Sequence, residues 1–110
     1  VPGLTLNQEP NNTKNTYWMV TAVIDPALDW PKERLMAVLD TEGIDSRPFF
    51  HPLSSLPAYD GQAEALAARK RNEVSYRLSP WGINFPSALC LTRAQVQRVA
   101  DTLRRILGVL

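Results

Sequence analysis

Residues 44–53, with the sequence IDSRPFFHPL, decide the fold assignment. They contain one arginine directly before Pro48, and an aromatic pair and the only histidine of the 110-residue chain between Pro48 and Pro52. Each proline favours extended geometry at the residue before it. The stretch therefore predicts a strand over residues 44–50 that runs out into a rigid connection over residues 51–61. Such a strand end can hold a guanidinium, two aromatic faces and an imidazole close together, which suits a phosphate or a flat ring.

The residues before this stretch predict a strand followed by a helix. Residues 16–25, TYWMVTAVID, are rich in β-branched and aromatic side chains on both alternating faces, which is typical of a strand buried on both sides. Asp29 is placed to cap a helix over residues 30–42, which carries an apolar stripe at helical spacing. Gly43 is a natural stop for that helix in left-handed geometry.

The residues after the stretch predict two short helices, a short strand and a longer helix. Residues 62–71 are rich in alanine and charge, and Asn72 can cap a second short helix. A short strand is expected over residues 83–85. Thr92 and Gln95 have the spacing of a capping box. The final helix then has one apolar face, made of Val96, Val99, Ala100, Leu103, Ile106 and Leu107. The fold class predicted is α+β, a small antiparallel or mixed sheet with helices on one face.

Length and composition predict one ordinary globular domain, with residues 1–15 as an extended lead-in and residues 16–110 as the domain. Hydrophobic residues make up 45% and charged residues 21% of the chain, and the net charge is +1. This charge argues against a nucleic-acid partner, and no apolar run is long enough for a membrane span. The single Cys90 lies in the apolar stretch SALCL, so we expect a buried thiol and a cytoplasmic protein.

Single residues of the stretch 44–53 suggest recognition and no catalysis. Arg47 can grip a phosphate or carboxylate, or pair with Asp45, and the spacing leaves both open. Phe49 and Phe50 should point to opposite faces, one of them into the core. His51 has no second histidine to share a metal with, so no metal site is expected. No serine lies in a nucleophile-elbow turn and no glycine loop is present to hold a phosphate.

Three longer motifs, one of which includes residues 44–53, carry a family resemblance. The order of NTYWMVTAVID, EGIDSRPFFHPLSSLPAY and GINFPSALCLT, with the helices between and after them, resembles the carboxy-terminal small domain of the DegT/DnrJ/StrS aminotransferases. The details SRPFFHPLSSLPAY and GINFPSA are most similar to the perosamine synthase branch. The family consists of fold-type I, pyridoxal-phosphate-dependent enzymes that act on nucleotide-linked keto sugars. The branch aminates a GDP-linked 4-keto-6-deoxy sugar, and the amino donor expected is glutamate.

The resemblance implies that the chain is one part of a longer, homodimeric enzyme. The matching positions imply substrate contacts by Arg47 at the diphosphate and by Phe49 or Phe50 at the sugar or base, with His51 hydrogen-bonding locally. It implies no catalytic residue here, because none of the three lysines, Lys14, Lys32 and Lys70, matches the family's cofactor lysine or is expected in a desolvated pocket. Pyridoxal phosphate is then expected in the parent protein, and this chain alone is expected to bind no cofactor and to be inactive.

Two alternative readings stay open at this point. Some relatives in the family are pyridoxal-phosphate-dependent dehydratases, and the position that distinguishes them is not in this chain. The other reading is a free-standing α+β module that binds a protein partner. The aminotransferase reading also predicts an exposed apolar face, with Trp18, Phe50 and Trp81 as candidates, through which the chain could self-associate.

Overall fold

The structure, a computed structural model that describes residues 1–109, is an α+β fold built on one antiparallel sheet. The strand order is β1-β2-β4-β3, and the strands span Leu4–Leu6, Val20–Ile24, Gly82–Phe85 and Arg47–Pro48 respectively. Every neighbouring pair is antiparallel. The predicted fold class, a small antiparallel sheet with helices, is confirmed.

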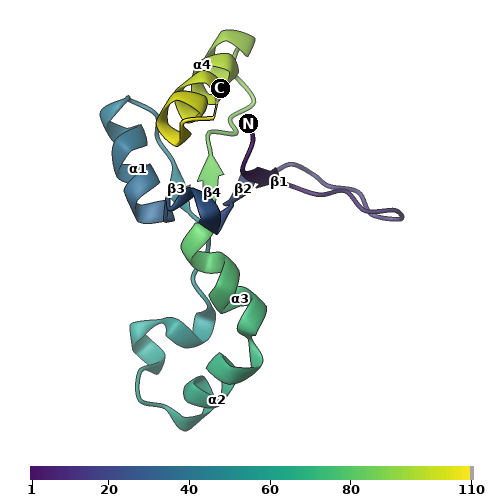
Figure 1. Cartoon of the computed structure of the whole chain (residues 1–110). Coiled ribbons are helices and arrows are strands. Elements are labelled where there is room, and N and C mark those ends of the chain that lie inside the picture. The colour runs from purple at the N-terminus through teal and green to yellow at the C-terminus, as the bar shows by residue number, and fades with distance from the viewer. Residues whose placement is uncertain (110) are drawn as a thin grey trace.

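One face of the sheet forms the core together with helices α1 and α4. The register sets Ala22 opposite Ile83 and Val20 opposite Phe85, so these side chains share a face. Helices α1 (Lys32–Thr41) and α4 (Arg93–Leu107) pack over that face (Figure 1). The buried apolar core consists of Ala22, Ile24, Leu35, Leu39, Ile44, Ile83, Phe85, Leu103 and Leu107. The other face carries Thr21 and Asn84 in the neighbouring row of the ladder.

The backbone conformation of Pro31 and Gly43 sets the two ends of helix α1. It starts after Pro31, which has no side-chain capping bond, and the stop at Gly43 is confirmed by its left-handed φ of 66°. The prediction that Asp29 caps this helix is wrong. Asp29 instead closes the 3₁₀ turn η1 (Pro26–Leu28) in left-handed geometry, and Asp25 caps that turn through a bond from the Ala27 amide. The N-cap position of α1 is taken by Pro31, and Asp29 lies two residues before it.

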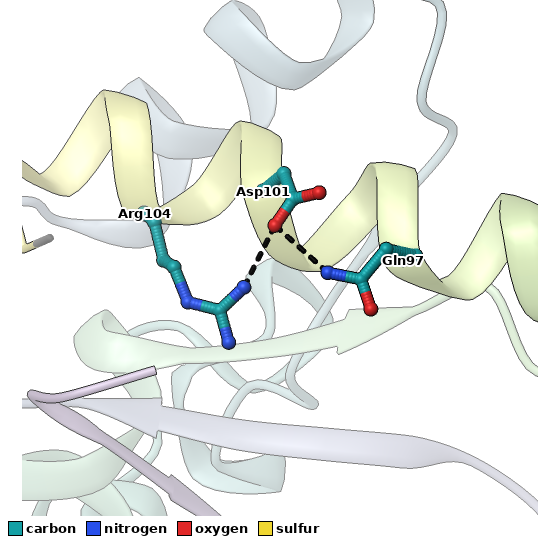
Figure 2. A network of polar contacts seen from close by, with 3 residues as sticks. All are labelled: Gln97, Asp101 and Arg104. Atoms are coloured by element: carbon teal, nitrogen blue, oxygen red, sulfur yellow. Dashed lines mark hydrogen bonds and ion pairs between the residues drawn. The ribbon is translucent and has the colours of Figure 1, made fainter.

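Helix α4 is capped as the sequence predicts. Thr92 Oγ1 accepts from the Gln95 amide, and Gln95 Oε1 accepts from the Thr92 amide at 2.8 Å, which completes the capping box. On its exposed side, Asp101 accepts hydrogen bonds from Gln97, four residues before it, and from Arg104, three residues after it (Figure 2). Its apolar face is buried in the second half, at Leu103 and Leu107, whereas its first half lies over a hollow described below.

The segment between β3 and β4 is a helical arm that extends away from the sheet (Figure 1). It comprises the 3₁₀ turns η2 (Leu53–Ser55) and η3 (Pro57–Tyr59), helices α2 (Ala63–Arg71) and α3 (Glu73–Leu78), and the turn η4 (Ser79–Trp81). Helix α2 has no buried residue. The arm is held internally by Ser54 and Tyr76, whose hydroxyls lie 2.9 Å apart. No helix within residues 1–109 is long and apolar enough to span a membrane.

One strand was not predicted, and two predicted strands are shorter in the structure. Part of the lead-in is an edge strand, because Leu4–Leu6 pairs with β2. The strand predicted over residues 16–25 begins only at Val20, since Tyr17 has a positive φ of 50° that interrupts extended backbone. The strand predicted over residues 44–50 is shorter in the structure and pairs with β4 only at Arg47–Pro48.

Two burial predictions are wrong. Cys90 is exposed, because the SALCL stretch forms a turn between β4 and α4 that no other element covers. Trp81 is half-buried and packs against the core, since η4 directs it inward. Trp18 and Phe50, the other two candidates for an exposed apolar face, are 73% and 65% exposed.

Candidate functional site

The strand end at residues 47–51 is fixed against β4 at the edge of the sheet. Arg47 lies opposite Asn84 and Pro48 lies opposite Ile83. Edge strands tolerate proline, because the amide on the outer side needs no partner. Beyond the ladder, the Phe49 amide donates to the Gly82 carbonyl at 3.1 Å. The segment therefore leaves the sheet in a defined direction.

Three successive carbonyls of this segment accept hydrogen bonds from three other elements. Asn84 Nδ2 of β4 donates to the Pro48 carbonyl at 3.2 Å, and Lys32 Nζ of α1 donates to the Phe49 carbonyl at 3.1 Å. Ser79 Oγ of η4 donates to the Phe50 carbonyl at 3.3 Å. Side chains on separate elements thus hold the backbone, so the side chains of the segment are presented from a rigid support.

The amide of Asn84 is itself fully engaged. It is 5% exposed, and its oxygen accepts from Thr21 Oγ1 at 2.7 Å while its nitrogen donates to the segment. A polar residue in the middle of a fully buried strand is the sequence signal that could have identified it, because buried polar groups need partners.

Lys32 is the residue that sequence reasoning missed most clearly. The sequence predicts no lysine in a desolvated pocket, yet Lys32 is 1% exposed. Its Nζ also donates to Ser79 Oγ at 3.2 Å, so the ammonium is satisfied by neutral oxygens. Burying a charged group is costly unless it is hydrogen-bonded in this way. Its position in the first turn of a helix gives no hint of burial, and no sequence signal would have found it.

Arg47 is exposed and forms the ion pair that the sequence left open. Its guanidinium lies 3.1 Å from the Asp45 carboxylate, and both side chains are about three-quarters exposed. A surface pair of this kind contributes about 0–1 kcal/mol. Arg47 can therefore exchange Asp45 for a phosphate or carboxylate at small cost, and this exchange would use its planar pair of donors.

The aromatic pair divides into one packed and one free ring. Phe49 is half-buried on the face of the sheet away from α1 and α4, where it lies directly over Gly82. Neither Phe49 nor Phe50 belongs to the core cluster, so the expectation that one of them enters the core is wrong. Phe50 and His51 are exposed and follow the anchored carbonyls. The structure thus presents Arg47, Phe50 and His51 outward.

Two hollows lie within residues 1–109, and neither is lined by the four residues of the strand end, Arg47, Phe49, Phe50 and His51. The larger, of about 630 Å³, is mostly apolar and lies between β1, β2 and the first half of α4, where Leu6, Val20 and Val96 are among its lining residues. The smaller, of about 170 Å³, lies in the helical arm between Ser54 and Tyr76. At the strand end, Arg47, Phe50 and His51 are exposed and form an open contact surface.

The described residues do not form a site for pyridoxal phosphate. The cofactor needs a lysine amine that faces a cavity. Lys14 and Lys70 are exposed, and the buried Lys32 donates to a carbonyl and a hydroxyl and lines neither hollow. Within residues 1–109 there is also no cluster of three acidic, histidine or cysteine side chains that could hold a metal.

Comparison with known proteins identifies the family. The model of the DegT/DnrJ/EryC1/StrS aminotransferase family matches residues 1–104. The chain belongs to this family. Among its family relatives, the GDP-perosamine synthase of Vibrio cholerae is 33% identical over 99 residues, covering 90% of this chain and 26% of the relative. The GDP-perosamine synthase of Caulobacter vibrioides is 30% identical over 94 residues, covering 86% of this chain and 24% of the relative. The chain thus spans about a quarter of the length of these proteins.

Solved structures of sugar aminotransferases share the fold of this family member. The structure of DesI in the presence of its TDP-sugar product matches with a TM-score of 0.78 and 25% identity, over 98% of this chain and 27% of that chain. Spr1654 of Streptococcus pneumoniae, described as a putative sugar aminotransferase, matches with a TM-score of 0.79 and 17% identity, over 96% of this chain and 26% of that chain. The second likeness concerns the fold alone.

Proposed function

We propose that this chain is the carboxy-terminal small domain of a nucleotide-sugar aminotransferase that uses pyridoxal phosphate. The parent reaction moves an amino group from glutamate to a 4-keto-6-deoxy sugar carried on a nucleotide diphosphate, GDP in the preferred reading. The chain itself contributes substrate contacts, and alone it is expected to be inactive.

The observation that carries this proposal is the 33% identity, over 90% of the chain, to a protein named GDP-perosamine synthase. Two further relatives, at 30% and 26% identity, have the same name. Family membership also favours an enzymatic parent over the free-standing interaction module. The nucleotide-sugar substrate is consistent with the TDP-sugar product named for the DesI structure.

The anchored strand end supports a division of roles among its side chains. Arg47 gives up its weak pair with Asp45 and binds the substrate diphosphate with two parallel hydrogen bonds. Phe50, exposed beside the anchored backbone, forms a wall of the sugar or base pocket. Phe49 supports this wall from its packed position over Gly82, and His51 forms a local hydrogen bond.

The remaining parts of the site come from outside this chain in the proposal. The longer enzyme holds pyridoxal phosphate, which supplies the electron sink for amino transfer when bound. We place the active site at the interface of a homodimer. We also propose that this enzyme is cytoplasmic. The role of this chain is to orient the substrate at that site, which lowers the entropic cost of bringing the keto carbon to the amino group.

The test is an amination assay of the full-length protein with glutamate and GDP-4-keto-6-deoxymannose. We expect a GDP-linked amino sugar by mass spectrometry, with a KM for the sugar nucleotide that rises about tenfold or more in Arg47→Ala. Asp45→Ala is the matched control, because it removes the other half of the same surface pair and should leave the KM within about twofold. A deoxygenated product without nitrogen would identify a dehydratase instead, and equal effects of the two substitutions would refute the role of Arg47.

A further inference from the structure

The buried ammonium of Lys32 controls two successive backbone positions of the strand end. It donates directly to the Phe49 carbonyl at 3.1 Å and to Ser79 Oγ at 3.2 Å. The Ser79 hydroxyl in turn donates to the Phe50 carbonyl at 3.3 Å. Two of the three bonds form a chain from the ammonium through the Ser79 hydroxyl to the Phe50 carbonyl, an arrangement in which one bond polarises the next.

Fold stability alone is a poor reason for a lysine at this position. Lys32 is the first residue of α1, where the helix dipole disfavours a positive charge. Among the described residues, 1–109, it has no carboxylate partner, although it is 1% exposed. An apolar side chain of similar length would fill the space without the desolvation cost. Charges that conflict with local stability rules are typical of positions kept for function.

The side chains that follow the two held carbonyls are the ones free to meet a ligand. Phe50 is 65% exposed, and His51 is exposed as well. Their backbone has no ladder partner, because β3 ends at Pro48. Without the ammonium, the Phe50–His51 backbone would therefore keep only the hydrogen bond from the Ser79 hydroxyl to the Phe50 carbonyl. The Ser79 hydroxyl would itself have lost the hydrogen bond that it accepts from Lys32.

We propose that Lys32 is a positioning residue that acts through the Phe49 carbonyl and Ser79 to set where Phe50 and His51 meet the nucleotide sugar. The proposal rests on the proposed function for the identity of the ligand. Its structural part, that one ammonium orders the Phe49–His51 backbone, stands on the contacts of this chain alone. The two parts are tested separately.

The structural part is tested by amide hydrogen exchange on the 110-residue chain. The Phe49 amide, bonded to Gly82, is the reporter, and the Ala22 amide in β2 is the reference. Lys32→Met should speed exchange at Phe49 by about tenfold or more relative to Ala22, because two acceptors lose their donor. Lys32→Arg, which keeps a charged donor, should restore at least part of the protection. Equal exchange at Phe49 in wild type and Lys32→Met would overturn the inference.

The functional part is tested on the full-length protein by comparing the two half-reactions. Lys32→Met should raise the KM for the sugar nucleotide about tenfold or more relative to its effect on the KM for glutamate, and Lys32→Arg should partly reverse this. Leu39→Ala is the control, since Leu39 is buried in the same helix but contacts the core. An equal KM change in Lys32→Met and Leu39→Ala would overturn the positioning role. Wild-type protein that aminates no nucleotide sugar would refute the proposed function, while the exchange result would still decide the structural part.

Discussion

The close packing of Phe49 against Gly82 predicts that a side chain at position 82 will destabilise the folded chain. Gly82 has an extended backbone, with φ −93° and ψ 136°, that any residue can adopt. A Cβ at this position would lie 2.5 Å from Phe49 Cβ and 2.6 Å from its Cγ, distances that real side chains do not show. Glycine is therefore required at position 82 because a side chain there would clash with Phe49, and not because of the backbone conformation.

We expect Gly82→Ala to lower the free energy of unfolding by about 2–4 kcal/mol. Overpacking of this kind costs about 1–3 kcal/mol. Displacing Phe49 also strains or breaks the bond from its amide to the Gly82 carbonyl, which adds about 1 kcal/mol. The assay is urea unfolding of the 110-residue chain, followed by circular dichroism at 25 °C.

A double substitution and a control separate this clash from other effects of the new methyl group. In Gly82→Ala/Phe49→Gly the new methyl group has no Phe49 side chain to clash with, so the combined loss should be smaller than the sum of the single losses by about 1–3 kcal/mol. Gly61→Ala is the control: it has open space but a positive φ of 76°, so it should cost about 1 kcal/mol and be additive with Phe49→Gly. Additive losses for Gly82 and Phe49, or a stable Gly82→Ala variant, would refute the reasoning.

Three further predictions concern the core, the helix cap and the surface pair. Leu103→Ala should lower the free energy of unfolding by about 2–5 kcal/mol, because Leu103 is 3% exposed and leaves a cavity; a loss under 1 kcal/mol in urea unfolding would contradict this packing. Thr92→Ala should cost about 1 kcal/mol by the same assay, since it removes the capping bond to Gln95, and Thr92→Ser should recover most of it. Asp45→Asn should change stability by less than about 1 kcal/mol, and a larger loss would mean that the pair with Arg47 is structural.

Local signals in the sequence were enough for most of the fold. The capping box of Thr92 and Gln95 and the stop at Gly43 depend on residues within one turn, and both are confirmed. Strand β2, in the centre of the sheet, follows from its β-branched composition. Because these features are encoded by near neighbours, a single sequence predicts them well.

The features that the sequence did not reveal depend on distant partners. Strand β1 forms only because Leu4–Leu6 finds β2 across the loop that joins them, and three residues carry no strand signal alone. The burial of Lys32 depends on acceptors 17 and 47 residues away. Cys90 shows the opposite error, since apolar neighbours in sequence do not guarantee a covering element. The candidate site at residues 47–51 stays a prediction, and the side chains that support its backbone depend on contacts that only the structure shows.

The central claim, that residues 47–51 contact the nucleotide sugar, is tested most directly by hydrogen–deuterium exchange of the full-length protein. Peptides spanning residues 47–51 are compared with and without GDP-4-keto-6-deoxymannose, and peptides of α2, which has no buried residue, serve as the internal reference. The account predicts slower exchange over residues 47–51 on binding and no change in α2. Binding of the sugar nucleotide with unchanged exchange over residues 47–51 would contradict it.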